Sequence, residues 1–233
     1  MKKTALFLTV RSTGIALGKN RKNLRIIIDL SDSSIDTNIP PLYLDQKYAI
    51  YLSGNINGYV DLEHFWGSKE TTARIVHAIL YKKNIKRLLR WTVGSFNLFI
   101  QTLNSVKWYT SVRGPGLYYQ KKDNKIFFYQ DDMEVRECCL SNGINEMELL
   151  HLVSQNISPA CSPFESIFNK VHRVPGGYYV KFSSDIKIQE YITEKDYDYK
   201  DINYETFKRI FEGTCRIVRE SCTEHKQYTT LSL

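Results

Sequence analysis

Short β-type segments, separated by turn residues, occupy most of the chain up to about residue 130. They are rich in Val, Ile, Tyr, Phe and Thr, the residues that favour strands. Residues 112–116 contain two glycines and a proline, and residues 121–125 have Asp123-Asn124 at their tip, so both segments predict tight turns between paired strands. The expected strands are 5–10, 24–30, 48–53, 96–103, 106–111, 117–121 and 125–129.

Apolar residues recur at helical spacing in three places. The pattern predicts one helix between Lys69 and Arg90, and a second that begins near Asn145, whose side chain can cap it, and ends before Pro159. A third helix is expected over 204–222, with five residues facing inward: Phe207, Ile210, Phe211, Ile217 and Val218. Between the last two, a Pro-Gly-Gly turn at 175–177 precedes strands at 178–182 and 188–191. The fold class that follows is α+β.

Each end of the chain carries a β-type segment. Two lysines followed by apolar residues could also begin a secretory signal, but Arg11 ends that run early and no small-residue cleavage site follows, so a buried strand is favoured. At the other end, residues 228–233 have a strand pattern after a helix, as the start of a parallel α/β domain does. We therefore expect the sequence to stop where a further domain begins.

The charge and the cysteines of the chain indicate which kinds of binding partner and which cellular compartment suit it. The formal net charge of +7 is spread along the chain, which weakens a nucleic-acid interpretation, and no apolar run approaches the roughly 18 to 20 residues of a membrane span. Five cysteines, two of them adjacent at Cys138 and Cys139, suit a reducing, cytoplasmic setting better than a disulfide framework. The five histidines lack metal-ligand spacing.

Standard catalytic signatures are absent from the sequence. There is no GxSxG elbow, no GxxxxGK[ST] loop and no GxGxxG fingerprint. Gly114-Pro115-Gly116 lacks the following helix that phosphate binding would need. The residues alone therefore indicate an α+β domain without an assigned chemistry.

Six segments stand in an order that a known family shares. They are RIIIDLS (25–31), YLSGNINGY (51–59), SKETTARIVHAIL (68–80), VGSFNLFI (93–100), SVRGPGLYY (111–119) and PFESIFNKVHRVPGGYYVKF (163–182). The chain resembles the N-terminal glutaminase-like half of the asparagine synthetase family, which includes the β-lactam synthetases and lasso-peptide cyclases. The segment at 163–182 is the most persuasive.

The resemblance implies a four-layer αββα N-terminal-nucleophile sandwich, as in glutamine amidotransferases, over residues 1–191. Residues 192–233 would be a linker, a helix and the first strand of a truncated α/β ATP-pyrophosphatase domain. Arg113, Gly114 and Gly116 would form the family's turn. Leu231 and Ser232 would approach the family's ATP loop, which begins Leu-Ser-Gly-Gly.

Several positions depart from the family's glutamine site. Active members use an N-terminal cysteine as nucleophile, whereas position 2 here is Lys2. Ser53 stands in place of the oxyanion Asn, Gly54 is retained, and Asn55 replaces the following Glu. Lys69 replaces the Asp that would hold the substrate's ammonium, so like charge stands where opposite charge is needed. These departures imply that the chain does not hydrolyse glutamine.

The resemblance therefore implies the N-terminal part of an ATP-dependent amide-forming ligase, closest in type to the cyclases and β-lactam synthetases that lack the cysteine. This chain would hold no cofactor, while ATP and Mg²⁺ would serve the missing synthetase domain, in cis or in trans, acting on a peptide or amino-acid-like substrate. The alternative is a free-standing, non-catalytic binding or partner subunit, favoured if the reading frame stops after Leu233. A nucleic-acid binder is the least favoured of the three.

Overall fold

The computed structural model describes residues 25–61, 63–112, 117–130, 132–153, 164–192 and 203–225. The predicted strands at 5–10 and 228–233 lie outside these residues. The chain divides into two compact units. The described parts of 19–53 and 95–192 form what we call the sandwich unit, and those of 54–94 and 193–233 form the helix-rich unit. Strands β4 (Ala49–Val60) and β6 (Thr92–Thr102) each run from one unit into the other.

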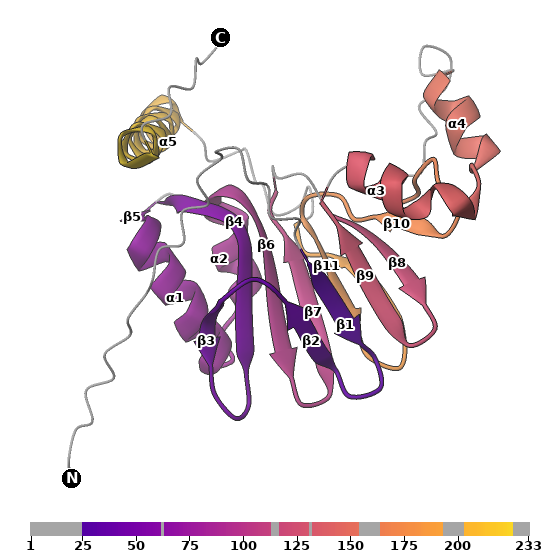
Figure 1. The fold of residues 1–233 in the computed structure, drawn as a ribbon. Helices are drawn as coiled ribbons and strands as arrows, with labels where there is room; N and C mark the ends of the chain where they lie inside the picture. Colours follow the sequence, from indigo (N-terminus) through magenta and orange to yellow (C-terminus); the bar gives the residue numbers. More distant parts are fainter. Residues whose placement is uncertain are drawn as a thin grey trace. The chain divides into compact units, whose positions relative to one another are not determined.

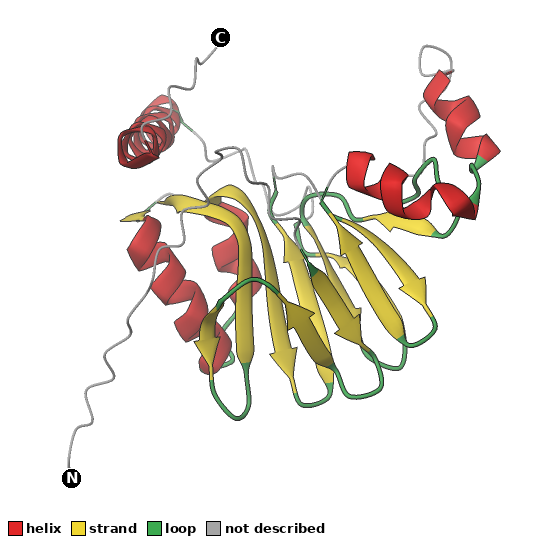
Figure 2. Ribbon diagram, in the orientation of Figure 1, coloured by secondary structure: helices red, strands yellow, loops and turns green. Residues whose placement is uncertain are grey.

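The sandwich unit contains a five-stranded sheet in which every pair is antiparallel (Figures 1 and 2). Its order is β10 (Val171–Arg173), β8 (Tyr118–Lys122), β9 (Lys125–Tyr129), β1 (Ile26–Asp29) and β2 (Ser34–Thr37). The predicted hairpin at 121–125 is confirmed, because Lys122 pairs with Lys125 and Asp123 takes a φ of +54° at the tip.

A second antiparallel set faces the first sheet in this unit. Strands β12 (Ile186–Glu190), β11 (Tyr178–Phe182), β7 (Ser105–Thr110) and β6 are neighbours in that order, and β3 (Pro41–Leu44) pairs with the start of β4. The predicted turn before β11 is confirmed: Gly177 has a φ of +83°. A Cβ at Gly176 would lie 2.4 Å from the Val112 carbonyl oxygen, so only glycine fits where this turn meets the end of β7.

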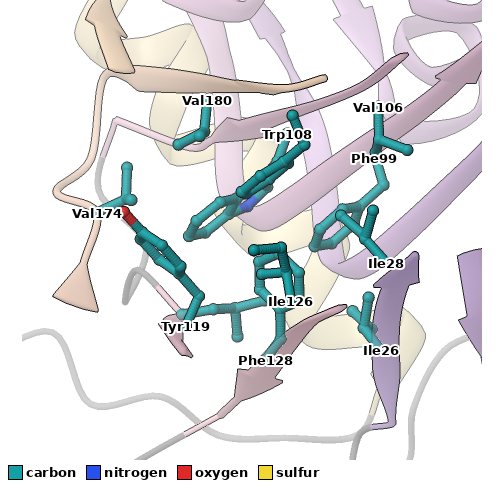
Figure 3. Packing of buried hydrophobic residues seen from close by; sticks show 12 residues of the cluster. Ile26, Ile28, Phe99, Val106, Trp108, Tyr119, Ile126, Phe128, Val174 and Val180 are labelled. Atoms are coloured by element: carbon teal, nitrogen blue, oxygen red, sulfur yellow. The ribbon is translucent and has the colours of Figure 1, made fainter. Parts of the chain in front are cut away.

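One continuous apolar core joins the two sets of strands (Figure 3). Alternation along each strand points one face inward, as β9 shows with Ile126 and Phe128 buried in it. Trp108 lies fully buried at its centre, and its indole nitrogen donates to Asn97 Oδ1 at 3.0 Å. The core consists of Ile26, Ile28, Phe99, Val106, Trp108, Leu117, Tyr119, Ile126, Phe128, Val174, Val180 and Phe182.

Helix α3 (Asp132–Cys139) covers part of the other face of the first sheet. Its Val135 and Cys139 pack with Tyr129 and Val171, and Phe127 borders this cluster. The sequence analysis did not predict this helix, nor strands β2, β3 and β10. The short η1 (Leu140–Asn142) follows it, and then α4 (Glu146–Val153), where Asn145 Oδ1 accepts from the Glu148 amide at 3.3 Å as the cap prediction requires.

The helix-rich unit contains the end of β4, β5 (Phe65–Gly67) and three helices. The single helix predicted between Lys69 and Arg90 is wrong: α1 (Ser68–Leu80) and α2 (Ile85–Trp91) are separate. Lys82 takes a φ of +52° between them, and Asn84 caps α2 by accepting from the Arg87 amide at 3.4 Å. The asparagine therefore starts a new helix.

Helix α5 (Tyr204–His225) confirms the third predicted helix, although two of the five residues predicted to face inward do not. Ile217 is fully buried, whereas Phe207 and Phe211 are 59% and 54% exposed. A Cβ at Gly58 of β4 would lie 2.7 Å from Ile217 Cδ1, and Gly213 approaches Phe65 closely. One side of α5 therefore packs on the β4–β5 hairpin, and the two phenylalanines lie elsewhere on its surface. No described helix is long and apolar enough to cross a membrane.

Candidate functional site

The segment predicted to stand at the oxyanion position lies inside β4. Ser53 is buried, and Gly54 takes a φ of +90°, which favours glycine over residues with a side chain. Asn55 is exposed. A Cβ at Gly94 would lie 2.3 Å from the Asn55 carbonyl oxygen, so glycine lets the two backbones approach closely. The backbone conformation at position 54 is therefore enough to explain why glycine occurs there, without any catalytic role.

Lys69 lies at the start of α1, where the backbone amides of the first turn point toward the helix end. The preceding Ser68 donates its hydroxyl to the Ile56 carbonyl at 2.6 Å, which ties this helix start to β4 next to Asn55. Lys69 is exposed. Because the helix dipole and the lysine are both positive, this corner disfavours an ammonium and suits an anion better.

A polar and aromatic cluster that the sequence analysis missed lies between β4 and β5. The Tyr59 hydroxyl donates to Asp61 Oδ2 at 2.5 Å, and Asp61 Oδ1 accepts from the backbone amides of Glu63 and His64 at 2.8 and 2.6 Å. The Tyr59 ring stacks on Trp66 at 4.2 Å. The same carboxylate therefore fixes the turn and the tyrosine.

Electrostatics within this cluster favour a neutral tyrosine and a charged aspartate. Burial, together with the hydrogen bond to Asp61, raises the pKa of the Tyr59 phenol. Burial by itself would raise the pKa of Asp61, but the hydrogen bonds that it accepts outweigh this and hold the pKa below its ordinary value. The pair is thus a structural hydrogen bond, not a proton donor poised near neutral pH.

The described cysteines offer no activated nucleophile. Burial, with the adjacent Cys139 as the next cause, raises the pKa of the Cys138 thiol, which keeps it protonated and unreactive. Cys139 is fully buried, and its thiol donates to Gln120 Oε1 at 3.7 Å, an atom that also accepts from Tyr129 at 3.3 Å. Among the residues that the structure describes, no three His, Cys, Asp or Glu side chains gather as a metal site would require.

An open hollow of about 200 Å³ lies on the sandwich unit beside α3. Its charged lining is already engaged, because Arg25 pairs with Asp36 and Glu134 accepts from the Gln130 amide at 2.6 Å. The remaining lining residues are Ile26, Ile27, Phe127, Phe128 and Tyr129. None of the predicted site residues lines this hollow.

The remaining predicted site residues are outside the described part of the chain: Lys2, Arg113, Gly114, Gly116, Leu231 and Ser232. Of the predicted set, the structure brings Gly54, Asn55 and Lys69 into one unit, linked through the bond from Ser68 to Ile56. The roles assigned to all these residues stay predictions.

No family model matches the chain, and no curated protein does. Among solved structures, the chain is similar to a glutamine phosphoribosylpyrophosphate amidotransferase from B. subtilis complexed with ADP and GMP, at 9% identity and a TM-score of 0.38, over 65% of this chain and 31% of that one. It is also similar to a structure of the allosteric regulatory enzyme of purine biosynthesis, at 12% identity and a TM-score of 0.39, over 67% and 32%. The chain spans about a third of the length of each.

Proposed function

We propose that this chain is a glutamine amidotransferase-like domain without glutaminase activity, the N-terminal part of an ATP-dependent amide-forming ligase. The observation that carries the proposal is the sandwich unit: antiparallel sheets packed face to face through one core, which includes several of the segments that resemble the asparagine synthetase family. The N-terminal-nucleophile assignment and the four-layer αββα arrangement belong to this proposal.

The loss of glutaminase activity is supported by the charge near Lys69. A substrate ammonium would meet a lysine at the start of a helix, both positive, instead of a carboxylate. Ser53 and Asn55 lack the side-chain amide and the carboxylate that the family places at these two positions, and the Cys138 thiol is not activated. Each difference removes a separate requirement for binding or hydrolysing glutamine.

In the proposed whole protein, amide formation belongs to a synthetase domain in cis or in trans. That domain would use ATP and Mg²⁺ to activate the carboxylate of a peptide or amino-acid-like substrate. Since this chain would supply no ammonia, the amine would come from a source other than glutamine. The present chain would contribute its folded sandwich and its surfaces.

Glutamine binding and hydrolysis test the proposal directly. We expect no glutamine-dependent release of ammonia by the purified chain and no heat of glutamine binding in calorimetry. The Lys69→Asp variant restores a carboxylate near the helix start, so it should gain weak glutamine binding while still lacking a nucleophile. Lys121→Asp, an equal charge change at an exposed hairpin, should gain none. Release of ammonia from glutamine by the unmodified chain would overturn the proposal.

A second candidate function is a non-catalytic partner subunit for a separate synthetase domain. The exposed aromatic residues of α5 favour it, because Phe207 and Phe211 stack at 6.2 Å and both rings are more than half exposed. A surface of this kind suits contact with another domain, whether it belongs to the same chain or a different one.

A further inference from the structure

The segment that contains α1 and α2 is strongly basic. Residues 68–91, all of them described, contain seven Lys and Arg against one acidic residue, a formal +6, whereas the whole chain carries +7. The basic residues are Lys69, Arg74, Lys82, Lys83, Lys86, Arg87 and Arg90. Residues 1–24 contain a further six Lys and Arg and no acidic residue, so the positive charge of the chain lies mainly in two stretches, and the pair of helices is the one that the structure describes.

Three of these cations lie in or next to the turn between the two helices and are exposed: Lys82, Lys83 and Arg87. The single acidic residue of the segment, Glu70, lies on the first turn of α1 and accepts from Arg74 at 2.7 Å. No acidic residue occurs between positions 81 and 91. The turn thus presents three exposed cations and contains no acidic residue of its own, a property that attracts a polyanion.

A row of planar groups runs along α1 toward this turn. The Arg74 guanidinium lies 4.0 Å from the centre of the Trp66 ring, and the His77 and Tyr81 rings lie 4.3 Å apart with 32° between their planes. Positions 74, 77 and 81 share one face of a helix because they are three and four residues apart. Tyr81 is 67% exposed, and its amide donates to the His77 carbonyl at 3.0 Å.

We propose that the α1–α2 turn binds single-stranded nucleic acid. Lys82, Lys83 and Arg87 would contact successive phosphates, and an unpaired base would stack on the face of the Tyr81 ring that His77 does not cover. Cations beside an exposed aromatic ring are the combination that single-strand binders use, and it requires no base pairing or sequence match.

The same turn is poorly suited to an anionic membrane. A helix that lies in the interface needs an exposed apolar face to enter the lipid. In α2 the apolar residues face inward instead: Leu89 is fully buried, and Ile85 and Leu88 are half-buried. Apart from the Tyr81 ring, the described residues of this turn and of α2 expose no large apolar side chain that could hold the cations on a bilayer.

Fluorescence anisotropy with a labelled oligo(dT) of about 15 nucleotides tests the proposal, with salt raised from about 50 to about 200 mM. The Lys82→Gln/Lys83→Gln/Arg87→Gln variant should bind more weakly, and the slope of log affinity against log salt should fall by about 2. Tyr81→Ala should lose roughly tenfold in affinity while the salt slope stays the same, since it removes stacking and no charge.

The matched control removes the same amount of charge from the sandwich unit. Lys121, Lys122 and Lys125 are all exposed on the β8–β9 hairpin, so Lys121→Gln/Lys122→Gln/Lys125→Gln should leave binding unchanged. Circular dichroism confirms that each variant is folded, and Tyr81→Ala tests the site even if the charge variant is not. The proposal is overturned by absence of binding at about 50 mM salt, by equal losses in the control, by tighter binding of a duplex, or by binding to phosphatidylserine vesicles without binding to the oligonucleotide.

Discussion

Aromatic residues serve opposite purposes in the sandwich core and on α5. In the core, Phe99 and Trp108 are fully buried and stack in parallel planes at 5.9 Å. On α5, Phe207 and Phe211 stack at a similar 6.2 Å, yet both are more than half exposed. Aromatic pairing is thus common to both regions, whereas burial is not. What differs is the presence of a second apolar layer to cover the rings.

The reason for the difference is geometric. Alternate residues are buried along strands such as β1 and β11, so one face of each sheet is apolar and meets the apolar face of the other. Helix α5 has apolar residues on more than one side, and the β4–β5 hairpin covers only the side that contains Gly213 and Ile217. Burial stabilises the first region, whereas the second leaves the rings of Phe207 and Phe211 more than half exposed.

The largest expected effect is the loss of the ring at the centre of the sandwich. Trp108→Ala should lower the free energy of unfolding by about 4 kcal/mol, because it leaves a cavity and removes the donor to buried Asn97. Urea denaturation followed by circular dichroism measures this. A loss below about 1 kcal/mol would show that the two sheets do not share a rigid core.

Two residues of α5 test the same difference between buried and exposed side chains within one helix. Ile217→Ala should cost about 3 kcal/mol, since Ile217 is fully buried against Gly58. Phe211→Ala, on the same helix but 54% exposed, should change the free energy of unfolding by less than about 0.5 kcal/mol. The same denaturation experiment compares them, and equal losses would mean that Phe211 is covered in solution.

Strands of the sandwich could be predicted because local chemistry and tertiary packing agree there. The alternation in 125–129 and the Asp123-Asn124 tip each point to the β8–β9 hairpin, and the structure has it. The missed strands, such as β5 with three residues, are too short to show a period. Antiparallel α+β architecture was therefore predictable, whereas the edges of the sheets were not.

Helices were predicted less well where apolar spacing continued through a break. Leu88 and Leu89 fall in step with Ile75 and Ile79, so periodicity alone extends one helix across the turn that Asn84 in fact ends. Helix α3 was missed because its buried Val135 and Cys139 stand among charged neighbours and show no clear apolar period. In both cases the spacing of the apolar residues was a poor guide to where the helices begin and end.

The candidate site was predictable only in part. Resemblance pointed to Ser53, Gly54, Asn55 and Lys69. The hydrogen bond from Ser68 to Ile56 links the strand that contains Asn55 to the helix start that contains Lys69. The Tyr59 and Asp61 pair could not be foreseen, because it depends on how the chain turns from β4 into β5 and brings two backbone amides to one carboxylate. Residue identity alone gives no such geometry.

The pH dependence of stability gives a further test of the same comparison, spread over two tyrosines. Burial raises the pKa of Tyr109 and of Tyr119 to about 12, with Tyr179 and Glu165 respectively adding to it. A folded-state pKa above the unfolded value of about 10 means that the native state keeps the proton longer. The associated stability is fully present below pH 10 and is lost as pH rises toward 12, on the order of 2 kcal/mol for each tyrosine.

Urea denaturation at several values between about pH 9 and about pH 11.5 should therefore show falling stability with rising pH. The Tyr109→Phe/Tyr119→Phe variant keeps both rings and should make this decline shallower, while Tyr59, whose pKa burial also raises, keeps its contribution. Tyr81→Phe/Tyr204→Phe removes two hydroxyls from side chains that are 67% and 72% exposed, so it should leave the decline unchanged. If the exposed pair flattened the profile as much as the buried pair, burial would not distinguish the sandwich core from the helix surfaces. The difference between buried and exposed aromatic residues would then not hold for tyrosine.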